Sequence, residues 1–281
     1  MQTSTDELGA YSEGELLDDL HSESLSAIEP LSPKSLKAIS NLARYKPPPD
    51  PYPFPEGRSA VLVCLFGSRS GDNLNVLLST RSQSLRTYPG QDMNLEATAR
   101  REAFEEVGLP IDTTRIRYLT SLPPFLARSM MLVTPVVCFV LDYSLKPELN
   151  PSEVSDLFSF PLEGFLTANP SHPTFHHPHP DSVLEGKTPY HTVEDYPWFD
   201  GRKHRFHAFE AHPQPIVGLT AEILIHVAMI AYNRSPDFLL RAPDEMSQRN
   251  LIRRAMKEPK FHEFRKKWRE KRPVMEREEK L

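Results

Sequence analysis

The chain has 281 residues, of which 39% are hydrophobic and 25% are charged, and its formal net charge is −5. This length supports one well-buried domain with appended segments, or at most two small domains. The composition excludes a chain that is disordered throughout, and the acidic balance excludes a protein that binds polyanions through a large positive charge. We therefore expect no nucleic-acid partner.

Two cysteines, Cys64 and Cys138, lie far apart within apolar stretches and are expected to be buried free thiols in a reducing compartment. The chain has no basic and hydrophobic N-terminal leader and no apolar stretch of membrane length, so we expect a soluble intracellular protein without a membrane span. The last residues, Lys280 and Leu281, lack the small residue that completes a peroxisomal address. The sequence does not decide between the cytosol and the peroxisome as the location, and it indicates no particular oligomeric state.

Residues 1–55 are expected to lie outside the main domain. Residues 1–33 contain acidic residues but no Lys or Arg, which predicts a flexible acidic tail. Residues 34–55 are expected to form a short amphipathic helix, over 35–45, and then an extended proline-rich linker. The helix prediction depends on three apolar residues at helical spacing, Leu36, Ile39 and Leu42. A ligand for a proline-recognition module is the alternative role for the linker.

Residues 56–235 are expected to form the main domain, an α/β unit whose strands follow apolar and β-branched runs. Five strands are predicted, over 58–66, 75–80, 115–121, 132–143 and 153–160. The fourth is nearly continuous in apolar residues, which indicates a central strand, and Pro135 within it requires a bulge or an edge position. Residues 218–232 predict a core-packing helix, because Glu222 and His226 argue against a membrane span.

Proline and histidine are frequent near residues 161–215, which predicts an irregular insertion that contains one edge strand, over 202–209. Four histidines in it suit no regular zinc-ligand spacing, so an insertion without metal is preferred to a zinc site: His172, His176, His177 and His179. Residues 236–281 are basic and predict a helical tail that packs locally or is solvated. A membrane surface, RNA or an acidic partner are the alternatives for this tail.

The residues that carry chemistry lie in the segment 90–109, GQDMNLEATARREAFEEVGL. It predicts a helix that begins at Asp92 or Asn94 and ends at Gly108. Three glutamates at positions i, i+3 and i+4 share one face of this helix, Glu102, Glu105 and Glu106. The adjoining face carries apolar side chains that are expected to pack inward, Ala99, Ala103, Phe104 and Val107.

Three neighbouring carboxylates repel one another unless a cation lies among them. Mg²⁺ prefers carboxylate oxygen and itself pairs with phosphate, so this face is a candidate metal site for a phosphate-containing substrate. A solvated acidic face is the alternative interpretation.

The run from Arg101 to Leu109, REAFEEVGL, resembles the second half of the Nudix box, in which a helix presents carboxylates to metal ions bound to a substrate diphosphate. The resemblance implies a Nudix α/β/α sandwich with a mixed, partly closed sheet. The box helix and the helix over 218–232 would cover opposite faces. It also implies a set of ligands for Mg²⁺ or Mn²⁺, namely Glu102, Glu105 and Glu106. Arg101 completes the expected catalytic set by bracing these glutamates through ion pairs.

Residues 78–91, LSTRSQSLRTYPGQ, resemble the upstream signature of the coenzyme A diphosphatase branch of this family. The resemblance implies hydrolysis of coenzyme A or an acyl derivative to 3′,5′-ADP and a phosphopantetheine. Arg81, Ser82 and Arg86 are the candidate substrate contacts in the signature, and arginine suits phosphate recognition. Arg128 is a further candidate phosphate contact, with an ordinary surface arginine as the alternative.

Two loop carboxylates, Glu153 and Asp156, are candidates for a further metal ligand or a general base. Solvated side chains are the alternative for both of them. The resemblance does not assign the general base to one residue, and a glutamate of the box helix is also a candidate for it.

The chain departs from the family directly after the signature. Gln91 is followed at once by Asp92, so the strand and paired glycines of the front half of the box are absent. Glycines there allow the backbone to approach metal and phosphate, and their loss would weaken or abolish activity. Because both flanks match the family, we interpret the gap as a splice variant or a truncated gene model. A Nudix hydrolase of NADH or a dinucleotide and a non-catalytic Nudix-like binding protein are the alternative functions.

Overall fold

The structure is a computed structural model that describes residues 31–50, 52, 57–69, 71–81, 94–142, 144–175, 179 and 181–270. The predicted acidic tail lies outside the described residues, apart from its last three.

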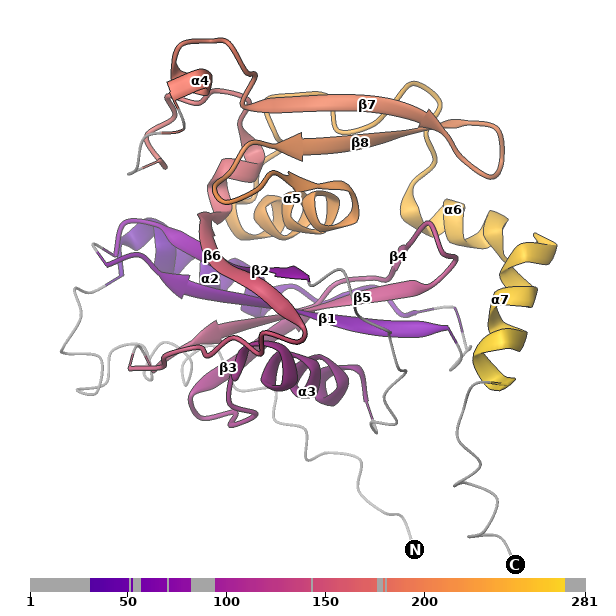
Figure 1. Ribbon diagram of the computed structural model, residues 1–281, viewed down its shortest axis with the longest axis horizontal. Coiled ribbons are helices and arrows are strands. Elements are labelled where there is room, and N and C mark those ends of the chain that lie inside the picture. The colour runs from indigo at the N-terminus through magenta and orange to yellow at the C-terminus, as the bar shows by residue number, and fades with distance from the viewer. Residues whose placement is uncertain are drawn as a thin grey trace, which may run out of the picture.

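The main sheet has six strands, and a second sheet has three (Figure 1). The strands of the main sheet are β1 (Arg58–Gly67), β2 (Leu74–Arg81), β3 (Ile116–Ser121), β4 (Phe125–Leu126), β5 (Leu132–Val140) and β6 (Val154–Pro161). Their order is β3-β5-β1-β2-β6, and β4 also pairs with β5. β1 runs parallel to β5, whereas the other neighbours are antiparallel. The predicted α/β class with a mixed sheet is confirmed, but the described strand path ends at β3 and β6, so the sheet is open.

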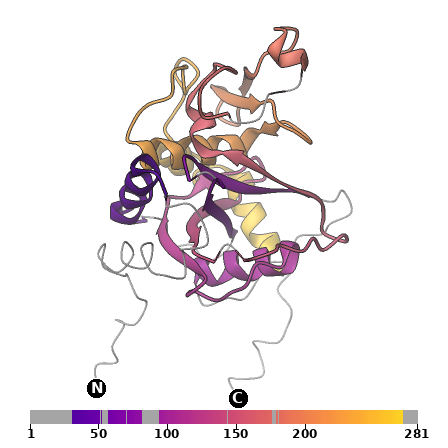
Figure 2. The same cartoon turned by 90° about the vertical axis from the view of Figure 1, so that its left-hand side faces the viewer.

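Two helices cover opposite faces of this sheet, as expected: α3 (Leu95–Val107) and α5 (Gly218–Tyr232) (Figures 1 and 2). Alternate residues of a strand point to opposite faces, so neighbouring positions in β1 and β5 enter different cores. Cys64 and Cys138 pack with α3, whereas Val63 and Val137 pack with α5.

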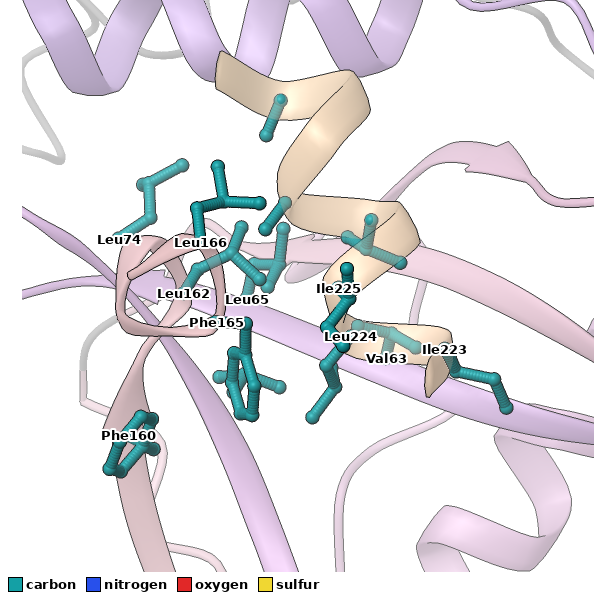
Figure 3. Packing of buried hydrophobic residues seen from close by; sticks show 14 of the residues in the cluster. Val63, Leu65, Leu74, Phe160, Leu162, Phe165, Leu166, Ile223, Leu224 and Ile225 are labelled. Atoms are coloured by element: carbon teal, nitrogen blue, oxygen red, sulfur yellow. The ribbon is translucent and has the colours of Figure 1, made fainter. Parts of the chain in front are cut away.

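The larger core lies between the sheet and α5. Figure 3 shows Leu65 of β1, Ile225 of α5 and Phe165 of the short 3-10 helix η2 (Leu162–Leu166) gathered in one group. None of these three side chains has measurable solvent exposure. Complete burial of such a side chain stabilises the fold by about 1.5–3 kcal/mol, so this layer fixes the sheet on which α3 rests.

β5 is the central strand predicted for this region, since it lies between β3 and β1. Pro135 within it lies opposite the interval between β3 and β4, where the N–H of Leu122 donates to the Pro135 carbonyl at 2.9 Å. The register of β3 shifts between Tyr118 and Thr120. Proline has no N–H to donate to a regular ladder, and Pro135 lies where β3 has ended and β4 has not yet begun.

The second sheet corrects the prediction of an irregular insertion. It contains β7 (His191–Pro197), β8 (Lys203–Phe209) and β9 (Ile216–Val217) in the order β7-β8-β9, on the far side of α5 (Figure 1). The strand expected at an edge, β8, is the middle one. The side chains of β7 are largely exposed, so its sequence lacks the apolar alternation that would have predicted it. A short helix, α4 (Asp181–Leu184), precedes this sheet.

The described parts of the N-terminal and C-terminal segments are tied to the body. α2 (Pro33–Arg44) begins at Ser32, whose side chain accepts from the N–H of Ser35, and it buries Ile39 and Leu42 as predicted. The tail forms α6 (Gln248–Ala255) and α7 (Pro259–Glu270), which pack locally through residues such as Leu251 and Phe261. In the linker, the Tyr52 hydroxyl donates to the Arg249 carbonyl at 2.8 Å. Across the described ranges, no helix has the length and apolar character to cross a membrane.

Candidate active site

The carboxylate helix α3 has well-defined ends. The Asn94 side chain accepts from the N–H of Ala97 at 2.7 Å, so Asn94 is the N-cap; the other candidate, Asp92, lies outside the described residues. At the other end, Gly108 has a φ of 67°, and the N–H of Leu109 donates to the Ala103 carbonyl at 3.4 Å. This glycine cap is the predicted helix end.

One face of α3 packs against the sheet through Ala99, Ala103 and Val107. Phe104 was expected on this face, but that prediction is wrong, because 53% of Phe104 is exposed. Successive residues of an α-helix are about 100° apart, which turns Phe104 away from the sheet when Ala103 faces it.

Arg100 occupies the buried face instead, and sequence reasoning missed it. It is 4% exposed, its Nε lies 2.8 Å from a Glu96 carboxylate oxygen, and its Nη1 donates to the Ile116 carbonyl at 3.0 Å. The sequence signal that was available is the i, i+4 spacing of Glu96 and Arg100. This contact joins α3 to β3.

The predicted brace between Arg101 and the glutamates is present as ion pairs. Arg101 Nη1 lies 2.8 Å from a Glu105 carboxylate oxygen, and Arg101 Nη2 lies 3.8 Å from one of Glu102. Glu105 is exposed, and Glu102 and Glu106 are partly exposed, so all three carboxylates are accessible from solvent.

The electrostatics of this surface favour a cation. The glutamates lie in the C-terminal half of α3, whose last turn contains no basic residue. The C-terminal end of a helix carries partial negative charge, which adds to the mutual repulsion of the carboxylates. The donors are carboxylate oxygens, the ligand type that Mg²⁺ and Mn²⁺ prefer, so the chemistry of the set fits a divalent ion. Within the described ranges, however, no three acidic, histidine or cysteine side chains gather closely enough to form a complete metal site.

The start of the predicted substrate signature lies where β2 meets β6. Arg81 is the last residue of β2 and pairs with Val154, while Thr80 pairs with Asp156. The Gln214 side chain donates to the Thr80 hydroxyl at 2.7 Å, which ties the segment before β9 to this corner. Ser82 and Arg86 lie outside the described residues, and so does the Arg81 side chain.

Arg128 lies elsewhere. It is exposed on the turn between β4 and β5, and this turn packs through Met130 against α6 and α7 rather than against α3. The described contacts of this turn therefore do not place Arg128 beside the glutamates of α3.

The proposed loop carboxylates occupy the start of β6. Glu153 is partly exposed and directly precedes the strand, and Asp156 is exposed within it. The Ser155 hydroxyl donates to the Asp156 carboxylate at 2.9 Å.

The histidines of the predicted insertion have structural contacts where they are described. The His172 Nδ1 accepts from the N–H of Thr174 at 3.3 Å, and the His179 ring lies 4.4 Å from the Phe175 ring. His176 and His177 lie outside the described residues. On α5, the His226 Nδ1 donates to the Glu222 carbonyl at 2.8 Å, so this histidine has a partner within its own helix.

A buried charge centre outside α3 was not predicted. His204 of β8 lies 2.8 Å from a Glu245 carboxylate oxygen and 3.6 Å from one of Glu222 on α5. Burial opposes the charge on His204, but hydrogen bonds to the two carboxylates and their charge raise its pKa to about 9. The signal that was available is Glu222, because a carboxylate in a mostly apolar helix requires a partner.

Comparison with known proteins agrees with this fold. Residues 56–185 match the family model of the NUDIX domain. The chain is 35% identical over 210 residues to the Nudix hydrolase 15, mitochondrial, of Arabidopsis thaliana, covering 69% of this chain and 65% of that protein. It is 34% identical over 184 residues to the peroxisomal coenzyme A diphosphatase 1 of Saccharomyces cerevisiae, covering 50% and 53% of the two chains.

A third relative is a peroxisomal coenzyme A diphosphatase of Mus musculus, 30% identical over 196 residues, with 64% of this chain and 72% of that protein covered. The fold and the site thus define an α/β protein that has a mixed sheet and an acidic helix on one face of it. The chain belongs to the Nudix family. It spans 65% and 53% of the lengths of the Arabidopsis and yeast relatives.

Proposed function

We propose that the chain is a metal-dependent hydrolase of a diphosphate linkage, with coenzyme A or an acyl derivative as substrate and 3′,5′-ADP and a phosphopantetheine as products. The observation that carries the proposal is the accessible carboxylate face of α3, with Arg101 paired to Glu105 at 2.8 Å. Two relatives that bear the name coenzyme A diphosphatase support the choice of substrate. The signature over residues 78–91 supports the same choice.

The glutamates of α3 and Arg101 have separate proposed roles. Glu102, Glu105 and Glu106 hold Mg²⁺ or Mn²⁺, which supplies positive charge that stabilises the diphosphate oxygens in the transition state. Arg101 holds Glu102 and Glu105 through its ion pairs. A side chain that is already held in one geometry loses less entropy when a ligand binds.

Three residues of the signature segment are proposed to position the anionic substrate, Arg81, Ser82 and Arg86. The arginines suit this role because a guanidinium binds phosphate oxygens with two parallel hydrogen bonds. Arg128, whose turn packs against α6 and α7, is not given this role. A carboxylate accepts the proton from the attacking water, and the candidates are Glu153 and the glutamates of α3.

Hydrolysis of another nucleoside diphosphate derivative, such as NADH or a dinucleotide, is the alternative within the same class. A non-catalytic coenzyme A-binding protein is the alternative from a different class. The direct junction of Gln91 and Asp92 favours it, because the paired glycines that bring backbone close to phosphate are absent.

A substrate panel tests the proposal. The protein is incubated with coenzyme A, NADH and a dinucleotide, each with Mg²⁺ or Mn²⁺, and products are identified by mass spectrometry. Release of 3′,5′-ADP from coenzyme A at the highest kcat/KM is the expected result. Faster hydrolysis of NADH or the dinucleotide would favour the first alternative. Binding of coenzyme A without turnover under every metal would favour the second.

A further inference from the structure

The C-terminal end of α3 is capped by another segment of the chain. The last carbonyls of a helix have no partner within it, and here three of them accept from the segment 148–150. The N–H of Glu148 donates to the Val107 carbonyl at 3.0 Å, and the N–H of Asn150 donates to the Glu106 carbonyl at 3.0 Å. The Asn150 Nδ2 donates to the Glu105 carbonyl at 3.2 Å. Asn150 alone thus binds the backbone of two of the glutamates proposed to hold metal.

The same asparagine organises the start of β6. Its carbonyl accepts from the N–H groups of Glu153 and Val154, both at 2.9 Å. Its Oδ1 accepts from the N–H of Ser152 at 3.2 Å and from the Ser152 hydroxyl at 2.6 Å. Both backbone and both side-chain polar groups of Asn150 are therefore engaged, with α3 on one side and β6 on the other.

β6 in turn pairs with the end of β2. Val154 lies opposite Arg81, the last residue before the remainder of the substrate signature. One residue therefore joins the backbone of Glu105 and Glu106 to the corner where β2 ends at Arg81. A helix end without such a cap frays, and the glutamates on its last turns would move with it.

We propose that Asn150 is a positioning residue that holds Glu105 and Glu106 in register with the substrate-binding corner of β2. The inference rests on the proposed function. Asn150 does not contact substrate in this account; it acts through the backbone of the two glutamates. An aspartate at this position would keep the Oδ1 acceptor but lose the Nδ2 donor, so the bond to Glu105 depends on the amide.

The chain contains a matched control. Asn169-Pro170-Ser171 repeats the tripeptide Asn150-Pro151-Ser152. The Asn169 Oδ1 accepts from the N–H of Ser171 at 2.9 Å, and its carbonyl accepts from the N–H of His172 at 3.1 Å. Asn169 follows η2, whereas Asn150 lies between β5 and β6 and caps α3. The two asparagines therefore share a local turn but differ in their contact with the carboxylate helix.

The test compares Asn150→Ala and Asn150→Asp with Asn169→Ala and with Ser152→Ala, which leaves both bonds to α3 intact. Each variant is measured for kcat and KM with coenzyme A, for Mn²⁺ affinity by calorimetry without substrate, and for thermal unfolding. A misplaced reacting group costs up to about a hundredfold in rate, so we expect kcat of both Asn150 variants to fall about tenfold or more. Their Mn²⁺ dissociation constant should rise several-fold, while Asn169→Ala and Ser152→Ala remain near the wild type in both quantities.

The outcomes separate this inference from the proposed function. Folded Asn150 variants with wild-type kcat and Mn²⁺ affinity would overturn the inference alone. If the wild type binds Mn²⁺ but hydrolyses nothing, the proposed function fails, and equal Mn²⁺ affinity in Asn150→Ala would overturn the inference as well. If the wild type neither hydrolyses a substrate nor binds Mn²⁺, both the proposed function and the inference about Asn150 are wrong. If neither Asn150 variant folds at the assay temperature, the residue is a structural cap and the positioning role is wrong.

Discussion

The backbone of Glu148 lies against Gly108 at the end of the carboxylate helix. A Cβ added to Gly108 would meet the Glu148 nitrogen and carbonyl oxygen at 3.3 Å each, and Gly108 has a φ of 67°. Two separate constraints therefore require glycine here, the left-handed backbone and the close approach of a second segment.

Gly108→Ala should consequently destabilise the protein by more than the strain of the backbone alone. The left-handed conformation costs a residue with a Cβ about 1–2 kcal/mol. Gly186→Ala is the matched control, because Gly186 has a φ of 71° but nothing within 4 Å of an added Cβ. Chemical denaturation should give a larger loss of unfolding free energy for Gly108→Ala. Equal losses for the two variants would show that the contact with Glu148 is not restrictive.

The charge centre around His204 predicts a pH dependence of stability. The pKa of His204 is raised from 6.5 to about 9 in the folded protein. A base whose pKa is raised by folding contributes stability that is complete below pH 6.5 and is lost as the pH rises through 9. Urea denaturation between pH 6 and pH 10 should show this decline in the wild type. In His204→Gln the decline over this interval should be smaller, and an unchanged slope would contradict the assignment.

His191 should behave in the opposite sense. Burial and the neighbouring His207, whose Nδ1 lies 3.0 Å from the His191 Nε2, lower the pKa of His191 to about 4. Its neutral form is favoured by folding, so the contribution is complete above pH 6.5 and is lost as the pH falls toward 4. An NMR titration of the imidazole signals should leave His191 neutral at pH 5. Protonation near pH 6.5 would contradict this prediction.

The two cysteines lie side by side, since Cys64 and Cys138 face each other in the register of β1 and β5. Both thiols are buried and free, and burial raises the pKa of Cys64 to about 12. The thiolate is the reactive form, so both should resist alkylation in the native protein at pH 8 and react once it is unfolded. Rapid labelling of the native protein would mean that α3 opens readily from the sheet.

Sequence reasoning succeeded where a pattern is local. The helix over 218–232 was predicted with its observed bounds, because it is a long apolar run. The ends of α3 followed from a capping asparagine and a glycine. The mixed sheet followed from apolar strands together with the resemblance of the motif around Arg101 to the Nudix box.

It failed where a feature depends on partners distant in sequence. Asn150 binds carbonyl groups, which every residue possesses, so no residue type in α3 could have indicated the contact. The partners of His204 come from α5 and the segment before α6 and meet only in the folded chain. Two further errors are local: the exposed strand β7 has no apolar alternation, and Phe104 was assigned to the buried face although its angular position turns it away.

The central claim is that the carboxylates of α3 carry hydrolysis of a coenzyme A diphosphate. The most direct measurement is release of 3′,5′-ADP from coenzyme A with Mn²⁺ by the wild type, Glu105→Gln, Glu106→Gln and Glu194→Gln. Glu194 is an exposed carboxylate on β7 and serves as the control. Loss of a group that merely supports a metal ligand costs about 10–100-fold, so loss of a proposed ligand should cost at least as much, while Glu194→Gln keeps its activity. No product from the folded wild type, or full activity in both α3 variants, would contradict the account.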